Sequence, residues 1–354
     1  MRIAVDARAL LAGRGVARYV RRLLTALAEQ FPSDDWHAFV PGREPVEIPE
    51  DVTPHRHPLG GRAVFGAASI LGRPPIDMLC DGADVVWIPA PAPVAPGRAP
   101  YVLTIHDLSF EDRPGDFTAY ERLWHRLARP GRLAGNAARV IAVSTATAVE
   151  AARWHVDATV VLSGVDHLSH APAPADGPAA GGGRAGYFLS VGALEPRKAP
   201  ELLAAAHQRA RSAGLRAELW FAGEGRIAVS GEGIRKLGVP HDEKLASLYS
   251  GALALVMPSW LEGFGLPPLE AAACGTPSIV SDLPVYDETL GPNVVRVPRG
   301  NEVALAGALL RMEREPEARA ALAKAAHEAV APFTWARAAR ETHAVLAEAA
   351  CSRS

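Results

Sequence analysis

Cysteine is scarce in this sequence, and its distribution excludes several kinds of site. The three cysteines, Cys80, Cys274 and Cys351, lie far apart with no C-x-x-C spacing. This argues against a disulfide framework and a zinc site, and it favours a reducing compartment such as the cytoplasm. The amino terminus has no long apolar core, so we expect no signal peptide. No stretch approaches the roughly 18 apolar residues of a membrane-spanning helix.

An excess of one charge is also missing. The 37 basic and 39 acidic side chains leave a formal net charge of −2. Nucleic-acid-binding domains usually carry a basic face, so nucleic acid is not expected as the main partner. With half of its residues apolar, the chain instead has the balance of a soluble globular protein.

The length of 354 residues is too great for one ordinary hydrophobic core and predicts two domains. Short apolar runs alternate with longer helical ones, which is typical of βαβ units in a parallel sheet. A Pro/Ala/Gly-rich run cannot pack a core and is interpreted as a linker. The expected parts are a Rossmann-like domain over 1–170, the linker over 171–186, a second Rossmann-like domain over 187–332, and a C-terminal helix over 333–354 that returns to the first domain.

The individual elements follow from the same pattern. A helix is expected from Val16, with Val20, Leu23 and Leu27 on one face. Further helices are expected at 200–214 and 242–252 and within 301–331. The strands are expected at 2–7, 36–41, 83–89, 101–107, 139–144, 159–163, 187–193, 217–223, 253–259 and 277–282.

The stretch "EGFGLPPLEAAACGTP", residues 262–277, combines two carboxylates with a glycine-loosened loop and a helix start. Glu262 lies in the loop, and Glu270 lies about one turn into the helix. A helix amino terminus offers free N–H groups and a positive dipole to a phosphate, and carboxylates accept hydrogen bonds from sugar hydroxyls. The alternative is a capped helix with solvent-exposed acids, which explains Glu270 but not the whole combination.

Two further motifs follow predicted strands. "GALEPRKAP" places Arg197 and Lys198 where cations could neutralise a departing diphosphate, although a solvated basic loop would look the same. "TIHDLSF" places His106 and Asp107 just past a strand, where the histidine is either catalytic or structural.

The loop "AGRGVAR" argues against a dinucleotide-binding dehydrogenase. Such an enzyme needs G-x-G-x-x-G and an acid that ends the second strand. Here Arg18 stands at the third glycine, and Asp34 and Asp35 precede the next strand instead of ending it. A hydride-transfer function is therefore not expected.

These motifs occur in a specific order along the chain. With "MRIAVDARALLAGRGVARYVRRLL", "VIAVS", "SGVD" and the helix "DEKLASLYSGA", the E-x7-E element resembles that of the retaining nucleotide-sugar glycosyltransferases of family four, group 1 type. This large family includes bacterial mannosyl- and glucosyltransferases, and the resemblance covers essentially the whole chain. It implies the GT-B fold, in which two Rossmann-like domains face a central cleft.

The resemblance also implies roles for residues. Arg197 and Lys198 would bind the donor diphosphate, although relatives often have Gly-Arg where this chain has Gly192-Ala193. Glu262 would hold the sugar hydroxyls, and His106 would lie near them. The implied donor-binding residues are Gly15, Gly192, Gly223, Gly238, Gly263, Phe264, Gly265, Leu266 and Glu270, the last at the ribose. The residues assigned to the acceptor are Asp107 and Arg14.

The activity implied by the resemblance is transfer of a sugar from a GDP- or UDP-linked donor, of mannose or glucose type, to a hydroxyl of a glycan, lipid-linked or natural-product acceptor. No D-x-D pattern is present to hold a divalent ion, so neither a metal nor another cofactor is expected. Two alternatives stay open: a nucleotide-sugar epimerase of the same fold, and a non-catalytic nucleotide-sugar-binding protein.

Residues 121–139 combine Trp124, Leu123 and Leu127 with Arg122, Arg126, Arg129 and Arg132. This segment is either a basic amphipathic surface that contacts a membrane peripherally or a packed helix with a solvated basic side. Pro130 interrupts it, which favours the packed helix.

Overall fold

The computed structural model describes residues 1–12, 15–57, 73–168 and 186–352 of the chain. It divides into two compact units: unit 1 comprises Met1–Gly164 and Thr334–Ser354, and unit 2 comprises Val165–Phe333. Of the expected linker over 171–186, only Gly186 belongs to the described residues. Within the described residues, no helix is both long enough and apolar enough to cross a bilayer.

Unit 1 contains one parallel sheet in the order β3-β2-β1-β4-β5-β6-β7. The central strands are apolar and fully buried, as is typical of a sheet that is covered on both faces. Its strands are β1 (Arg2–Asp6), β2 (Asp35–Pro41), β3 (Val52–His57), β4 (Val85–Ile88), β5 (Tyr101–Ile105), β6 (Arg139–Ala142) and β7 (Ala158–Val160).

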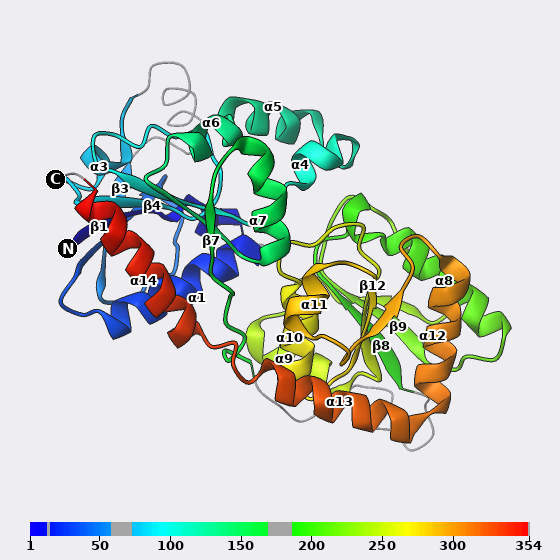
Figure 1. Cartoon of the computed structure of the whole chain (residues 1–354). Helices are drawn as coiled ribbons and strands as arrows, with labels where there is room; N and C mark the ends of the chain where they lie inside the picture. Colours follow the sequence, from blue (N-terminus) through cyan, green and yellow to red (C-terminus); the bar gives the residue numbers. More distant parts are fainter. Residues whose placement is uncertain (13–14, 58–72, 169–185, 353–354) are drawn as a thin grey trace. The chain divides into compact units, whose positions relative to one another are not determined.

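Helices cover both faces of this sheet, and in Figure 1 the red α14 runs beside the blue α1 on one of them. On the other face, side chains from α3, α6 and α7 join the strands in one apolar cluster. The helical elements are η1 (Ala7–Ala12), α1 (Gly15–Gln30), α3 (Ile76–Leu79), α4 (Ser109–Asp112), η2 (Pro114–Asp116), α5 (Ala119–Ala128), α6 (Pro130–Gly135), α7 (Thr145–Ala151), η3 (Ala152–Trp154) and α14 (Trp335–Cys351).

The C-terminal helix α14 is held in unit 1 by a polar and aromatic cluster near the start of β2. His343 Nε2 lies 2.6 Å from the Asp34 carboxylate, and the Met1 amino group lies 2.6 Å from the same side chain. The His343 ring stacks on Phe31, with 3.5 Å between centroids. The expected return of the C-terminal helix to the first domain is thus confirmed.

We expect the contribution of Asp34 to stability to depend on pH. Burial by itself would raise the pKa of Asp34, but hydrogen bonds from the Met1 amino group and His343 outweigh it and lower the pKa. A lowered carboxyl pKa stabilises the fold at neutral pH, and this contribution is lost as the pH falls below about 4. Asp34→Asn should therefore destabilise the protein by about 1 kcal/mol at pH 7.

Thermal unfolding of the wild type and Asp34→Asn at pH 7 and in acid measures this difference. The gap between the two midpoints should narrow in acid. Asp51→Asn, at an exposed aspartate of the same unit, is the matched control and should leave the midpoint unchanged at both values. A gap that stays constant with pH would contradict the prediction.

Unit 2 contains a second parallel sheet in the order β10-β9-β8-β11-β12-β13. Its strands are β8 (Tyr187–Val191), β9 (Glu218–Ala222), β10 (Ile234–Lys236), β11 (Ala254–Met257), β12 (Ser278–Ser281) and β13 (Val295–Val297). Its helical elements are η5 (Pro196–Lys198), α8 (Pro200–Ser212), α9 (Asp242–Gly251), α10 (Leu266–Ala273), α11 (Val285–Thr289), α12 (Glu302–Arg314) and α13 (Pro316–Val330).

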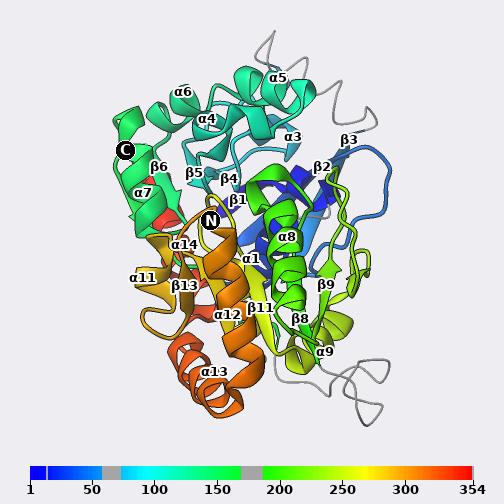
Figure 2. The same ribbon diagram turned by 90° about the vertical axis from the view of Figure 1, so that its right-hand side faces the viewer.

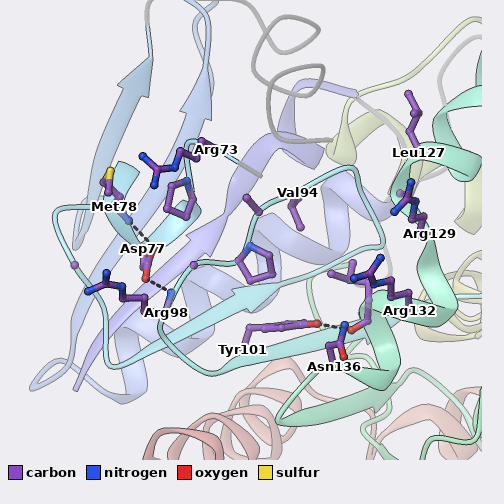
Figure 3. Close-up of a pocket in the computed structure, with 17 residues that line it drawn as sticks. Arg73, Asp77, Met78, Val94, Arg98, Tyr101, Leu127, Arg129, Arg132 and Asn136 are labelled. Atoms are coloured by element: carbon purple, nitrogen blue, oxygen red, sulfur yellow. Dashed lines mark hydrogen bonds between the residues drawn. The ribbon is translucent and has the colours of Figure 1, made fainter. Parts of the chain in front are cut away.

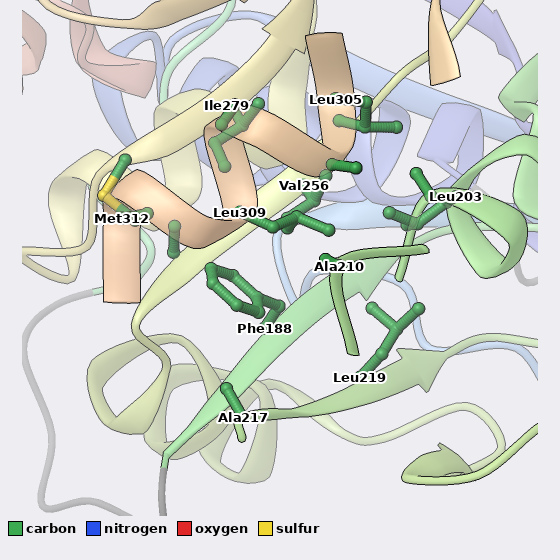
Figure 4. Packing of buried hydrophobic residues seen from close by; sticks show 14 of the residues in the cluster. Phe188, Leu203, Ala210, Ala217, Leu219, Val256, Ile279, Leu305, Leu309 and Met312 are labelled. Carbon is green, nitrogen blue, oxygen red and sulfur yellow. The ribbon is translucent and has the colours of Figure 1, made fainter. Parts of the chain in front are cut away.

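The two faces of this sheet bury different residues of the same strand. Phe188 packs against Leu203 of α8 and Leu309 of α12 in the cluster shown in Figure 4. Its neighbours Tyr187 and Leu189 point to the opposite face, toward α9 and α10. Figure 2 shows α8 and α12 side by side. Such alternation places helices on both faces, so two Rossmann-like units are confirmed.

Candidate active site

Two loops of unit 2 meet at the carboxyl ends of neighbouring strands. One follows β8 and carries Arg197 and Lys198, and the other follows β11 and carries Glu262. Lys198 Nζ donates to Glu262 Oε1 at 2.5 Å, and both side chains are largely buried. The Trp260 N–H donates to the Arg197 carbonyl at 2.9 Å, which ties the loops together. The structure thus brings together two residues that lie 64 positions apart.

Arg197 is placed differently from its neighbour. Its Nε lies 3.5 Å from the Glu195 carboxylate, and the side chain is 23% exposed. Arg197 thus lies on the same short turn as Lys198, and part of its side chain stays at the surface.

The loop after β11 leads directly into α10. Gly265 adopts a left-handed conformation with φ of +75°, and a Cβ there would lie 2.8 Å from the ring of Tyr286. Phe264 is nearly buried and packs edge-to-face on Phe333. α10 starts at Leu266, with proline in its first turn, and ends before Gly275 as the sequence predicts.

Tyr286 of α11 closes the back of this loop, and the sequence analysis did not identify it. Burial raises its pKa well above the usual tyrosine value, and the nearby Glu262 carboxylate raises it further. Its buried hydroxyl has no hydrogen-bond partner among the described residues. Ser259 Oγ, just after β11, is also buried and also has no hydrogen-bond partner among the described residues. Nothing in the local sequence around Tyr286 indicates that it faces the glutamate.

Three of the glycines assigned to the donor also lie together. The Gly192 N–H donates to the carbonyl of Ala222, and Gly223 forms an isolated antiparallel bridge with Gly238. A Cβ on Gly223 would lie 2.0 Å from the Gly192 carbonyl oxygen. The loops after β8 and β9 can approach this closely only because Gly223 has no side chain.

We expect Gly223→Ala to damage this edge of the sheet. The added methyl would overlap backbone atoms, and the φ of +155° disfavours any side chain. The cost is about 2–3 kcal/mol of unfolding free energy, because the loops must separate. Gly307→Ala, on α12 with open space around the position, is the matched control. Denaturant unfolding should distinguish them, and equal midpoints would contradict the assigned close approach.

The second glutamate of the motif, Glu270, is completely buried on α10. The Tyr249 hydroxyl of α9 donates to Glu270 Oε2 at 2.9 Å, and His167 Nε2 lies 3.2 Å from Oε1. The carboxylate therefore joins three segments of unit 2 behind the loop that carries Glu262. His167 and Tyr249 were not identified from the sequence, because both lie in segments whose pattern explains them as structural. The predicted contact between Glu270 and a ribose stays a prediction.

In unit 1, His106 lies directly after β5, as the sequence predicts. Its Nε2 is 2.8 Å from the Pro89 carbonyl oxygen, and its ring packs edge-to-face on Tyr19. Because a carbonyl can only accept, Nε2 carries the proton and Nδ1 keeps its lone pair. Burial lowers the pKa of His106, against the opposing effects of the Pro89 carbonyl and Asp107. The imidazole is therefore neutral at pH 7 and can accept a hydrogen bond from a hydroxyl.

The other unit 1 residues are placed as follows. The Asp107 carboxylate accepts from the N–H and the hydroxyl of Ser109, at 2.9 and 2.5 Å, so it organises the turn into α4. Gly15 is exposed and begins α1. Arg14 lies outside the described residues. The predicted contacts of these three residues with substrates stay predictions.

Comparison with known proteins identifies related families for both parts of the chain. Residues 182–329 match the family model described as glycosyl transferases group 1. Residues 13–167 match the model described as Glycosyltransferase Family 4. Together the two matches span nearly all of both units.

Curated relatives align with parts of the chain. The O-antigen chain mannosyltransferase RfbU of Salmonella typhimurium is 47% identical over 75 residues, which is 21% of each chain. The D-inositol 3-phosphate glycosyltransferase of Frankia alni is 33% identical over 251 residues, which is 60% of each chain. The chain thus spans between 21% and 60% of the length of these two relatives.

Solved structures resemble the whole chain in fold. Sucrose-phosphate synthase from Thermosynechococcus elongatus has a TM-score of 0.77 at 20% identity, with 99% of each chain covered. HepE of Anabaena, solved in complex with UDP and glucose, has a TM-score of 0.68 at 17% identity, covering 98% of this chain and 99% of its own. At these identities the similarity concerns the fold alone.

Proposed function

The chain belongs to the group 1, family 4 type of glycosyltransferases, and we propose that it transfers a sugar from a nucleoside diphosphate sugar to a hydroxyl acceptor with retention of the anomeric configuration. The observation that carries the proposal is the contact between Lys198 and Glu262 at the carboxyl ends of β8 and β11. Open parallel sheets bind ligands at this edge.

Unit 2 supplies the groups that a donor diphosphate needs. The Lys198 ammonium and the Arg197 guanidinium would bind the two phosphates and stabilise the negative charge that grows as the glycosidic bond breaks. The N–H groups at the start of α10 add positive potential. Glu262, released from Lys198, would then accept hydrogen bonds from the sugar hydroxyls. We propose that these groups act without a divalent ion.

Retention is proposed to follow a front-face course. The acceptor oxygen bonds to the anomeric carbon on the side from which the diphosphate leaves, and a diphosphate oxygen takes the acceptor proton. A double displacement would need a free carboxylate as the nucleophile. Glu262 is proposed to hold the sugar hydroxyls, and Glu270 is enclosed by Tyr249 and His167, so neither is assigned that role.

Unit 1 is proposed to contact the sugar and the acceptor. The neutral His106, with its Nδ1 lone pair available as an acceptor, would bind a sugar hydroxyl. Gly15, which leaves the start of α1 without a side chain, would offer its backbone N–H to the donor phosphate or sugar. The relatives include mannosyltransferases and inositol-phosphate glycosyltransferases, which supports GDP-mannose or UDP-linked glucose-type sugars as the first donors to test.

The proposal is tested by thermal unfolding with UDP, GDP and their sugar conjugates in the presence of EDTA. A ligand that binds only the folded state raises the midpoint by mass action. The stabilising donor is then incubated with candidate acceptors. Release of nucleoside diphosphate that requires an acceptor supports transfer, whereas a changed sugar with the nucleotide still attached identifies an epimerase. No shift with any nucleotide would overturn the donor site.

A further inference from the structure

A cavity in the described part of unit 1 lies far from His106. Its volume is about 900 Å³, and it is lined by α3, by the loop before β5, and by the ends of α5 and α6 (Figure 3). Gly82 precedes β4, Arg98 precedes β5 and Asn136 precedes β6. These strands are parallel neighbours, so the cavity lies at their amino ends. His106 lies at the opposite end of β5, about 16 Å away along the strand.

The charge of this cavity differs from that of the whole chain. Four arginines line it, Arg73, Arg98, Arg129 and Arg132, and the lining contains one carboxylate, that of Asp77. None of the four guanidinium groups forms an ion pair with any residue that the structure describes. Among the described residues, the lining therefore carries an excess of positive charge, on a chain with a net charge of −2.

Asp77 does not neutralise the arginines, because its oxygens already accept hydrogen bonds from the backbone. They bind the N–H groups of Met78 at 2.8 Å, Arg98 at 2.7 Å and Ala99 at 3.2 Å. Asp77 thus fixes the loop that carries Arg98. On the other wall, the Tyr101 hydroxyl donates to the Leu133 carbonyl at 2.5 Å and fixes the segment that carries Arg132. Both walls are held in place without a ligand.

Two apolar side chains of the lining are unusually exposed. Met78 is 67% exposed and Leu127 is 41% exposed. Leu123, on the same face of α5 as Leu127, is 53% exposed. Arginines at the ends of helices are common as partners of the helix dipole, which would explain Arg129 and Arg132. That explanation does not extend to Arg73 and Arg98, which lie in loops, or to the exposed apolar side chains.

We propose that this cavity binds the phosphate group of an amphiphilic molecule. Guanidinium groups match phosphate oxygens bidentately, and several arginines can share one phosphate or bind two. Met78 and Leu127 would contact the apolar part of the ligand. The shared chemistry is an alkyl phosphate, supplied either by a phospholipid headgroup in a bilayer or by a dispersed phosphorylated amphiphile. The site shares no residue with the proposed donor site, because it is built from residues at the amino ends of the unit 1 strands.

The test uses the full chain with Lys198→Ala, so that the proposed donor site cannot bind the probe. In this background we compare Arg98→Gln/Arg132→Gln with Arg43→Gln/Arg311→Gln. The control pair removes two exposed arginines that do not line the cavity and causes the same change in charge. All four positions are exposed, so the melting midpoints should agree. The probes are dodecyl phosphate below its micelle concentration and vesicles of phosphatidylglycerol and phosphatidylcholine in equal parts.

The cavity pair should weaken dodecyl phosphate binding by roughly tenfold or more, and the control pair by less than about twofold. If the cavity pair also reduces sedimentation with vesicles, the source is a bilayer headgroup. If vesicle binding is absent while dodecyl phosphate binds, the source is a dispersed amphiphile. The proposal is overturned if the two double variants lose affinity for dodecyl phosphate equally, or if neither probe binds.

Discussion

Lys198→Met is expected to lower sugar transfer by about 10²–10³-fold. Lys198 is the buried cation at the carboxyl ends of β8 and β11, and its proposed role is to stabilise the charge that develops on the departing diphosphate. Removal of one preorganised group of this kind from a transition state commonly has an effect of this size. Methionine keeps most of the aliphatic stem, so the packing around the site should change little.

The measurement is the rate of acceptor-dependent release of nucleoside diphosphate, together with binding of the free nucleoside diphosphate and of the nucleoside. Affinity for the diphosphate should fall, and affinity for the nucleoside should not. Lys324→Met, at an exposed lysine of α13, is the matched control. The substitution leaves the Glu262 carboxylate without this partner, which by itself can destabilise the fold. The double variant Lys198→Met/Glu262→Gln removes that charge, so comparing the two variants shows whether the loss of affinity comes only from lower stability. Equal losses of affinity for the nucleoside and for the nucleoside diphosphate would contradict the assignment of Lys198 to the diphosphate.

Glu270→Ala is expected to destabilise unit 2 by about 3–5 kcal/mol. The carboxylate is fully buried, and its loss removes the acceptor of the Tyr249 hydroxyl, removes the carboxylate 3.2 Å from His167 Nε2, and opens a cavity in the same place. For a unit of this size the melting midpoint should fall by about 6–20 °C. Tyr249→Phe, which removes one hydrogen bond, should cost only about 1 kcal/mol.

Thermal unfolding measures the change, with Glu243→Ala on the exposed face of α9 as the control, expected within about 0.5 kcal/mol of the wild type. Glu270→Gln keeps an acceptor for the Tyr249 hydroxyl and nearly the same side-chain volume. It therefore separates the effect of the lost charge on stability from the effect of the cavity. If Glu270 also binds the donor ribose, Glu270→Gln should reduce the preference for a nucleoside diphosphate over its 2′-deoxy form. A midpoint for Glu270→Ala equal to that of Glu243→Ala would show that the buried network does not hold the unit together.

The sequence predicted the central strands and missed three of the four edge strands, for a physical reason. The strands β5, β8 and β11 are largely apolar runs, because both of their faces are covered. The strands β3, β10 and β13 were not predicted, and all three lie at sheet edges. β3 has the sequence "VTPHRH" and is largely exposed beyond its first residue. An edge strand needs only one neighbour, so its apolar pattern is weak.

For the candidate site, the sequence indicated the residue types but not their partners. The spacing of Glu262 and Glu270 and the glycines around α10 predicted a helix start at a sheet edge, and the structure has it there. Nothing local could indicate that Tyr286 lies near Glu262 or that His167 lies against Glu270. These pairs join separate segments of the chain, and only the packing of the helices on the sheet brings them together.

The sequence by itself determined the α/β class, the division into two Rossmann-like units, and the family, because periodicity and glycine placement are local properties of the chain. The tertiary structure alone decided which charges meet. It paired Lys198 with Glu262, enclosed Glu270 completely, and collected Arg98 and Arg132 at one cavity. The reason is that burial and ion pairing depend on the three-dimensional neighbours of a side chain, which strand order and loop length fix together.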